Sequence, residues 1–325
     1  MPSSLHTTRR RALQLGAGLG AGLALPAVRA QDYPSAPIRM IIPTPAGGGH
    51  DAMMRLVGQK LTEAWGQPAI VESKAGAAGS LAAGFVAKAP ADGHTMLLTY
   101  SAYLSNQVLQ PNPGYKAADF VPVCLLVLTP IAIGVRSSLG VNTIQEWVAL
   151  AKKQPGKLTY GSYGQGSGGH FVGEQLNAAA GIETTHVPYK GEAPAIQDVL
   201  GGQVDAVIAS LGGASRYPGR IKALAVASPT RFPVYRDVPT FAEAGLPAVN
   251  MPGWGGVFVP AATPKPVVER LAAELNRIIL LPDVAPKMLD LGFEPVGWRG
   301  ARFTGFLDEQ MAMIKALVDS GRVKL

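Results

Sequence analysis

The sequence predicts an α/β fold built from two domains, and three observations support this prediction. Short aliphatic or β-branched runs alternate along the chain with longer segments of helical periodicity. A strand, a glycine-rich loop and a helix follow one another near residues 45–51 and again near 161–169, once in each half. The length of 325 residues favours two domains of ordinary size over one large domain.

The first half of the chain contains three strand-like runs and two helical segments. The runs at 38–43, 69–72 and 95–100 are short and aliphatic, which is typical of buried strands. Between them, two segments carry apolar side chains near i, i+3 and i+4, as amphipathic helices do, at 52–65 and 79–89. Residues 120–135 form a long extended apolar stretch, and we expect it to run from one domain into the other.

The second half continues the alternation. A helix is predicted at 144–153, and Leu158 begins the second strand, loop and helix unit. Further strands are expected at 186–189, 206–209, 223–227 and 255–260, and further helices at 193–200, 267–280 and 302–320. The sequence shows no repeat of 20–50 residues, so a solenoid or propeller is not predicted.

The first 30 residues have the pattern of an export signal that is cleaved. Arginines at 9–11 precede residues 12–28, an apolar run rich in Ala, Gly and Leu. Val28 and Ala30 place small side chains three and one positions before Gln31, as a cleavage site requires. The run is shorter than the roughly 20 residues that span a bilayer, which argues against an anchor. We therefore expect a soluble mature protein in the periplasm, exported by either the general or the twin-arginine route.

Composition and charge exclude several classes of protein. Hydrophobic residues make up 47% of the chain and charged residues 16%, so disorder is excluded. The formal charge of +7 includes four leader arginines, and without them 25 basic residues face 22 acidic ones. Because no basic run remains to follow phosphates, we expect no nucleic acid partner. The single cysteine, Cys124, lies in an apolar run and excludes a disulfide framework and a multi-cysteine zinc site.

The segment Gly164-Gln-Gly166-Ser-Gly-Gly169 satisfies the dinucleotide fingerprint G-x-G-x-x-G. The acidic residue that this fingerprint needs after the next strand is missing, because that strand leads to Lys190. A loop that binds a small anion through backbone N–H groups at a helix N-terminus is the favoured interpretation. A nucleotide-dependent α/β enzyme that uses this loop remains the alternative.

The polar residues near the two loops do not form a catalytic set. Asp51 lies where a carboxylate stabilises a helix N-terminus, and neither Ser162 nor Ser167 completes G-x-S-x-G. The histidines show no metal-ligand spacing, although His50 and His170 lie at the two loops and are candidates for ligand contact. Glycine, hydroxyl and backbone groups suit binding without turnover, so we expect no enzyme, no cofactor and no metal.

An ordered set of motifs resembles one protein family, the Bug receptors of tripartite tricarboxylate transporters. The motifs span the mature chain and include Tyr33-Pro-x-x-Pro-Ile, Pro45-Ala-Gly-Gly-Gly-His-Asp, Ala89-Pro-Ala-Asp-Gly, His186-Val-Pro-Tyr-Lys-Gly-Glu-Ala-Pro-Ala, Leu200-Gly-Gly-Gln-Val-Asp and Arg236-Asp-Val-Pro-Thr-Phe. The resemblance implies a two-lobed periplasmic-binding-protein fold of type II, each lobe a mixed sheet flanked by helices. Lobe 1 would comprise 31–130 and 252–325, and lobe 2 would comprise 131–251, with the ligand in the cleft.

The resemblance also implies a function and a set of binding residues. The protein would be a monomer that binds a small carboxylate or dicarboxylate and delivers it to a membrane permease. The implied contacts in the first lobe are Ala46, Gly47, Gly48, His50, Asp51, Thr99 and Ser101. Those in the second lobe are Ser162, Tyr163, Gly166, Ser167, His170, Ala193 and Asp205.

Two departures from the family pattern leave the ligand open. Relatives often carry small hydroxyl residues at Gly49 and His50, and a Ser-Ser pair at Ser162 and Tyr163. The larger side chains of His50 and Tyr163 make an aromatic carboxylate conceivable beside a short aliphatic dicarboxylate. Because neither loop contains Arg or Lys, we expect neutral donors such as the Ser167 hydroxyl to hold the carboxylate.

Overall fold

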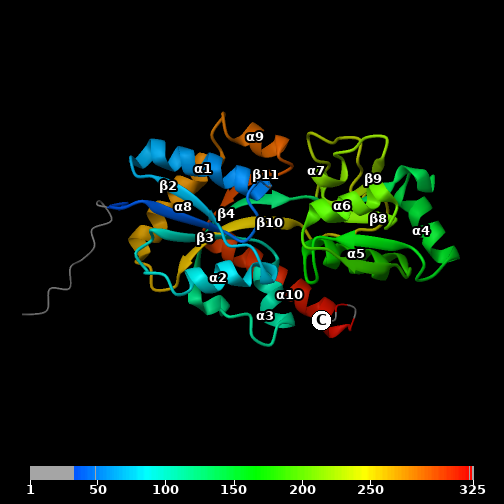
Figure 1. Ribbon diagram of the computed structural model, residues 1–325, viewed down its shortest axis with the longest axis horizontal. Coiled ribbons are helices and arrows are strands. Elements are labelled where there is room, and N and C mark those ends of the chain that lie inside the picture. The colour runs from blue at the N-terminus through cyan, green and yellow to red at the C-terminus, as the bar shows by residue number, and fades with distance from the viewer. Residues whose placement is uncertain (1–32, 48, 322, 324–325) are drawn as a thin grey trace, which may run out of the picture. The chain divides into compact units, whose positions relative to one another are not determined.

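The computed structural model describes residues 33–47, 49–321 and 323. The predicted export signal at 1–30 and the loop residue Gly48 lie outside the described residues. The described chain folds into strands that form two separate mixed sheets, each flanked by helices (Figure 1). None of its helices is both long and apolar enough to cross a lipid bilayer.

The first sheet has six strands in the order β11-β4-β10-β3-β1-β2. Their bounds are β1 (Ile38–Ile42), β2 (Ala69–Ser73), β3 (Thr95–Thr99), β4 (Phe120–Thr129), β10 (Gly253–Pro260) and β11 (Glu294–Trp298). Strand β1 is parallel to β2 and β3, whereas β10 is antiparallel to both β3 and β4. The carboxyl ends of β1, β3 and β4 therefore lie at one edge, together with the amino end of β10.

Helices cover both faces of the first sheet (Figure 1). On one face, α1 (Gly49–Trp65) packs against α8 (Lys265–Ile279), and α9 (Ala285–Asp290) packs against β11. On the other face lie α2 (Ser80–Val86), α3 (Ala102–Leu109) and α10 (Ala301–Asp319). The helices pack on the sheet because each has an apolar face. In α8, for example, Val267, Leu271 and Leu275 recur every four residues and are buried, as expected for an amphipathic helix.

The second sheet has five strands in the order β7-β6-β8-β5-β9. Their bounds are β5 (Ile131–Arg136), β6 (Thr159–Ser162), β7 (Thr185–Pro188), β8 (Ala206–Ser210) and β9 (Ile221–Ala227). Four helices accompany it: α4 (Ile144–Lys153), α5 (Gly168–Ala180), α6 (Glu192–Gly201) and α7 (Leu211–Ala214). Alternate residues of β8 face opposite sides, so that Ile208 belongs to the core with α5 and Val207 packs with α6.

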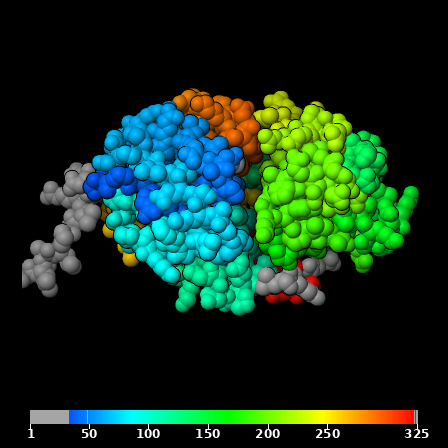
Figure 2. Space-filling model, viewed as in Figure 1, coloured from blue at the N-terminus to red at the C-terminus, as the bar shows by residue number. Residues whose placement is uncertain are grey.

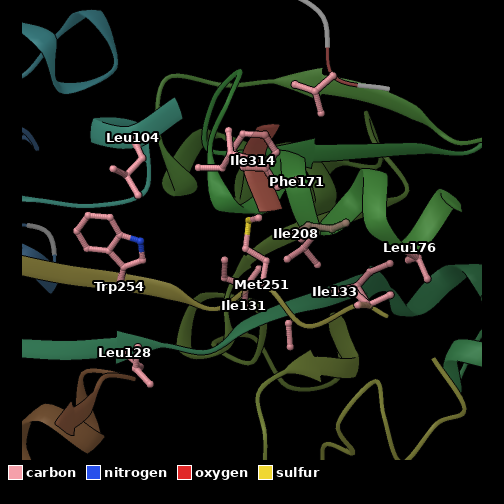
Figure 3. Packing of buried hydrophobic residues seen from close by; sticks show 14 of the residues in the cluster. Leu104, Leu128, Ile131, Ile133, Phe171, Leu176, Ile208, Met251, Trp254 and Ile314 are labelled. Carbon is pink, nitrogen blue, oxygen red and sulfur yellow. The ribbon is translucent and has the colours of Figure 1, made fainter. Parts of the chain in front are cut away.

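One continuous hydrophobic core joins the two sheets (Figure 3). Trp254 at the start of β10 and Met251 just before it belong to the same buried cluster as Ile131 and Phe171 of the second sheet. Ile314 of α10 also joins this cluster. The two sheets are thus packed on a shared set of side chains as well as linked by the chain.

The structure changes two expectations about the elements. Residues 120–135 were expected as one extended stretch, but the stretch divides into β4 and β5, which belong to different sheets on either side of Pro130. Proline lacks the N–H that would continue the ladder, which explains the break. Strand β11 was not predicted, because Pro295 and Gly297 interrupt the strand pattern.

Candidate functional site

The two sheets present the carboxyl ends of their strands to one another. In the first sheet, β3 and β4 end at Thr99 and Thr129, and in the second, β6 and β8 end at Ser162 and Ser210. Strand β5 begins at Ile131, opposite Ser210, two residues after β4 ends. In α/β proteins, ligands bind outside the carboxyl ends of the strands. Figure 2 shows the seam along which the blue and cyan residues of the first sheet's side meet the green residues of the second.

The first glycine-rich loop, residues 45–51 and here called the first loop, is held by Asp51. The Asp51 Oδ2 atom accepts hydrogen bonds from Gly47 N at 3.0 Å and from Arg55 Nε at 2.9 Å. The Arg55 guanidinium, ahead of the Gly47 N–H group, lowers the pKa of the Asp51 carboxyl below its usual range. Gly47 has φ of +85°, which favours glycine, and Ala46 beside it is exposed.

His50 is enclosed by aromatic rings. Its ring centroid lies 5.8 Å from that of Tyr100 and 5.1 Å from that of Phe293. Burial lowers the pKa of His50 to about 4, so the imidazole is neutral at pH 7. A Cβ atom placed on Gly49 would lie 3.1 Å from Phe293, which leaves little room for a side chain there.

Four buried polar atoms at this edge have no hydrogen-bond partner among the described residues: Thr44 Oγ1, His50 Nε2, Asp51 Oδ1 and Thr129 Oγ1. They belong to the turn after β1, the first turn of α1 and the last residue of β4. A buried polar group without a partner costs about 1–3 kcal/mol. The edge of the first sheet is therefore prepared for a polar ligand or for ordered water.

The second glycine-rich loop, residues 161–169 and here called the second loop, satisfies its own polar groups. Gly166 N donates to His170 Nδ1 at 3.1 Å, and His170 N donates to the capping hydroxyl of Ser167 at 3.3 Å. Ser162 Oγ lies 2.7 Å from His186 Nε2, and the His186 ring stacks on His170 at 4.0 Å. Burial lowers the pKa of His170 to about 4 and that of His186 to about 3. These groups thus find their partners within the second loop, α5 and β7.

Tyr163 reaches from the second loop to the N-terminus of α5. The Gly169 backbone N–H donates a hydrogen bond to the Tyr163 hydroxyl. Burial, ahead of the nearby Glu192 carboxyl, raises the pKa of Tyr163. A Cβ atom placed on Gly168 would lie 2.6 Å from the Tyr163 hydroxyl and 3.7 Å from Ser101 Oγ. Ser101 of the first sheet's side and Tyr163 of the second therefore converge on the same helix end.

Turn geometry and close packing explain the three fingerprint glycines. Gly164 and Gly166 have φ of +140° and +67°, values that favour glycine. A Cβ atom on Gly169 would lie 2.3 Å from the carbonyl oxygen of Ile208, so α5 packs directly on β8. A Cβ atom on Gly166 would lie 2.8 Å from Leu109 of α3. The pattern arises here without any role for a nucleotide.

The second loop also bonds directly to the first sheet's side. Ser105 of α3 donates its hydroxyl to the Gly166 carbonyl oxygen at 2.7 Å, and Ser105 is fully buried. This contact fixes the second loop against α3. The facing edges of the two sheets are therefore close together in this structure.

One of the expected contact residues, Asp205, does not join this group. Asp205 precedes β8 and lies at the opposite edge of the second sheet, because β8 runs parallel to β6 away from it. Its Oδ1 accepts from Arg136 at 2.8 Å and its Oδ2 from Thr159 N at 3.0 Å. Ala193 is exposed in the first turn of α6, directly after Glu192, and so stays among the candidates at the facing edge. The other described candidates lie at the facing edges or in the two loops.

Three residues at this edge were not singled out from the sequence. Glu192 accepts hydrogen bonds from Ser210 N at 2.7 Å and Ser210 Oγ at 2.9 Å, and burial raises the pKa of its carboxyl. Tyr100 and Phe293 enclose His50. Glu192 belongs to the motif that begins at His186 and is the first residue of the helix after β7, and Tyr100 follows β3 directly. Phe293 carried no such signal, because the strand after it was not predicted.

Two surface cavities lie away from this edge. One of about 400 Å³ is lined by α4, α5 and Leu246, and one of about 340 Å³ is lined by Arg136, Arg220 and neighbouring loops. No cluster of three or more potential metal ligands occurs among the described residues.

The fold and the facing edges define the class of two-lobed periplasmic binding proteins, and this is confirmed by comparison with solved structures. The structure of BugD, a periplasmic binding protein, superposes with a TM-score of 0.80 at 31% identity, over 90% of this chain and all of that chain. The R. palustris protein Rpa4515 with adipate gives a TM-score of 0.84 at 30% identity, over 90% and 99%. MatC from Rhodopseudomonas palustris with bound malate gives 0.78 at 30%, over 88% and 100%.

Sequence comparison identifies the family. The model of the tripartite tricarboxylate transporter family receptor matches residues 53–322, and the chain belongs to this family. A protein from the tcbD-tcbE intergenic region of Pseudomonas sp. strain P51 is 38% identical over 91% of this chain and 89% of its own. BugT of Bordetella pertussis is 31% identical over 94% and 95%. The resemblance drawn from the motifs is confirmed, and the nucleotide-dependent enzyme is not favoured.

Proposed function

We propose that this protein is an extracytoplasmic receptor that binds a small carboxylate or dicarboxylate and delivers it to a membrane permease of the tripartite tricarboxylate type. Membership of the receptor family supports the role, and the structural relatives with adipate and malate support the ligand class. The receptor acts as a monomer, without catalysis and without a cofactor.

The proposal includes a location and a division into lobes. The export signal at 1–30 is cleaved and the mature protein works in the periplasm. Residues 31–130 with 252–325 form lobe 1, and residues 131–251 form lobe 2. The positions of the chain crossings support this division, since β4 ends at Thr129, β5 begins at Ile131 and β10 begins at Gly253.

The observation that carries the ligand proposal is the set of buried hydrogen-bond donors without a partner among the described residues at the edge of the first sheet, Thr44 Oγ1, His50 Nε2 and Thr129 Oγ1. The ligand carboxylate would lie against the first loop, where the N–H groups at the start of α1 favour an anion. Arg55 offsets the charge of Asp51, and the neutral His50 can donate one hydrogen bond. Thr99 and Ser101 follow on the neighbouring strand end.

Native mass spectrometry on periplasmic material that has not been refolded tests the ligand class. A co-purified small acid is expected, and isothermal titration with that acid should give saturable one-site binding to the stripped protein. The matched variant is His50→Leu, which removes the unpartnered imidazole, keeps a side chain of similar volume and should bind the acid about tenfold more weakly. Binding of a neutral or cationic solute in place of an acid would contradict the proposal.

A further inference from the structure

The side chain of Tyr163 lies where the second loop could otherwise hold an anion. The start of α5 offers backbone N–H groups and the positive end of the helix dipole. In this structure the Gly169 backbone is bonded to the Tyr163 hydroxyl, and His170 N is bonded to the Ser167 cap. Two of the donors that could hold a carboxylate at this helix end, the N–H groups of Gly169 and His170, are therefore engaged by neutral groups of the protein itself.

The Tyr163 ring also fills space between the two sheets. Its hydroxyl and Ile131 Cδ1 each lie 2.6 Å from a Cβ position on Gly168, and Ile131 Cδ1 lies 3.3 Å from a Cβ position on Gly253. Gly253 pairs with Thr129, whose hydroxyl has no partner among the described residues. Tyr163 thus stands at the second-sheet end of the region whose first-sheet end carries the unpartnered atoms.

We infer that Tyr163 is a specificity-determining residue that limits ligand length. Its ring closes the α5 end of the site. The receptor therefore binds one carboxylate at the first loop and has no second anion-binding site at the second loop. Ligands with a short chain, or with a neutral distal end, are preferred over long dicarboxylates.

This inference rests on the proposed function, because it concerns the ligand of the same site. It adds a preference for ligand length, which the proposed function does not specify. Replacing Tyr163 by serine removes the ring and frees the start of α5, so the preference should move toward longer dicarboxylates. A longer diacid that reaches Gly169 gains hydrogen bonds to an ion, which corresponds to a gain of about tenfold or more in affinity.

The experiment is a titration of linear dicarboxylates from malonate to suberate, with the matching monocarboxylates, against the full mature chain and its variants. Tyr163→Ser should move the optimum to a longer diacid and raise the affinity for it about tenfold. Tyr163→Phe keeps the ring, so the wild-type length order should persist. Tyr217→Ser removes the same atoms near the opposite edge of the second sheet and should change nothing. If Tyr163→Ser unfolds, Tyr163→Val should show the same shift.

The outcomes separate the inference from the proposed function. An unchanged length order in a folded Tyr163→Ser variant overturns the inference while acid binding by the wild type still stands. Binding of long diacids by the variant alone supports the inference. If neither protein binds any acid of the series, the proposed function itself fails and the inference fails with it.

Discussion

The first and second loops share a glycine-rich sequence before a helix, but their polar groups are engaged differently. The first loop leaves His50 Nε2 and Asp51 Oδ1 buried and without a partner among the described residues. The second loop directs its N–H groups to the His170 ring, the Ser167 hydroxyl and the Tyr163 hydroxyl. The first loop thus has polar atoms free to bind a polar ligand, whereas the polar groups of the second loop already bond to one another.

The difference teaches that glycine content alone does not define an anion-binding loop. In the second loop, glycine is required at Gly169 by the closeness of α5 to β8. In the first loop, glycine is required at Gly49 because the Phe293 ring leaves little room for a side chain there. If the comparison is right, changes in the second loop should affect stability most, whereas changes in the first loop should affect binding most.

The largest effect is expected from acid. His170 is buried, and its pKa is lowered from 6.5 to about 4 in the folded state. Between these values the unfolded chain binds the proton and the folded chain does not, so stability is full above pH 6.5 and falls until about pH 4. This loss is on the order of 3 kcal/mol for His170 alone, and His186 acts in the same direction.

Chemical denaturation from pH 7 to pH 4 measures this loss. The His50→Leu variant removes the one buried histidine of the first loop and should retain most of the pH dependence. The contributions of His170, His186 and Glu192, the last with a raised pKa that acts in the opposite direction, are present in both proteins, so the difference between them reports His50 alone. A free energy of unfolding that does not change between pH 7 and pH 4 would contradict the conclusion that His170 and His186 are buried in the neutral form.

The next effect is expected from Gly169→Ala. The added methyl group would lie 2.3 Å from the Ile208 carbonyl oxygen, so the start of α5 must move away from β8. Overpacking of this kind costs about 1–3 kcal/mol, and we expect the upper end because the neighbour is backbone. Thermal unfolding measures it, with Gly305→Ala of α10 as the control, because that position is open and the change should stabilise the helix. Equal unfolding temperatures for the two variants would sink the packing argument.

A smaller effect with the opposite sign is expected from His50→Leu. The imidazole is buried with an unpartnered nitrogen, so an apolar side chain of similar size should stabilise the fold by about 1 kcal/mol. The same change should weaken acid binding by about tenfold, because it removes a donor to the ligand. Denaturation and calorimetric titration on one sample check both signs. A variant that is less stable and binds normally would show that His50 serves packing alone.

The smallest effect is expected from Ser167→Ala. The Ser167 hydroxyl was expected from the sequence to hold the ligand, but it accepts the His170 N–H as the N-cap of α5. Loss of such a cap costs about 1 kcal/mol of stability. Affinity for the acid should change less than in His50→Leu. A loss of binding larger than that of His50→Leu, with unchanged stability, would restore Ser167 as a ligand contact.

Much of the fold could be predicted because its signals are local. The helix at 144–153 was predicted with the bounds that the structure has, since Trp147 and Ala151 recur on one buried face. Strands β1 and β3 were also located to within a residue. Strand β11 was missed because a proline and a glycine inside it outweigh the pattern, and its pairing with β4 is a long-range contact.

The candidate site was harder to predict, because partners within a loop depend on where side chains point. The sequence placed Ser162 and Ser167 in the second loop and His170 directly after it, but a glycine-rich helix start has the same pattern whether it binds an anion or packs on a strand. Asp205 lies at the far edge because strand direction decides which end of β8 faces the first sheet. The sequence did mark His50 and Tyr163 as unusual, and both lie in the facing edges.

The position of β10 in the first sheet has a consequence for how the chain folds during synthesis. Strand β10 separates β3 from β4, yet the ribosome completes the whole second sheet before it reaches Gly253. Until then the apolar β4 has no neighbour in its own sheet, since β11 is made later still. Pairings so distant in sequence slow folding and leave apolar strands open to aggregation. The edge of the first sheet that faces the second sheet is therefore among the last parts of the molecule to form, and a fragment lacking residues 253–325 would not contain it.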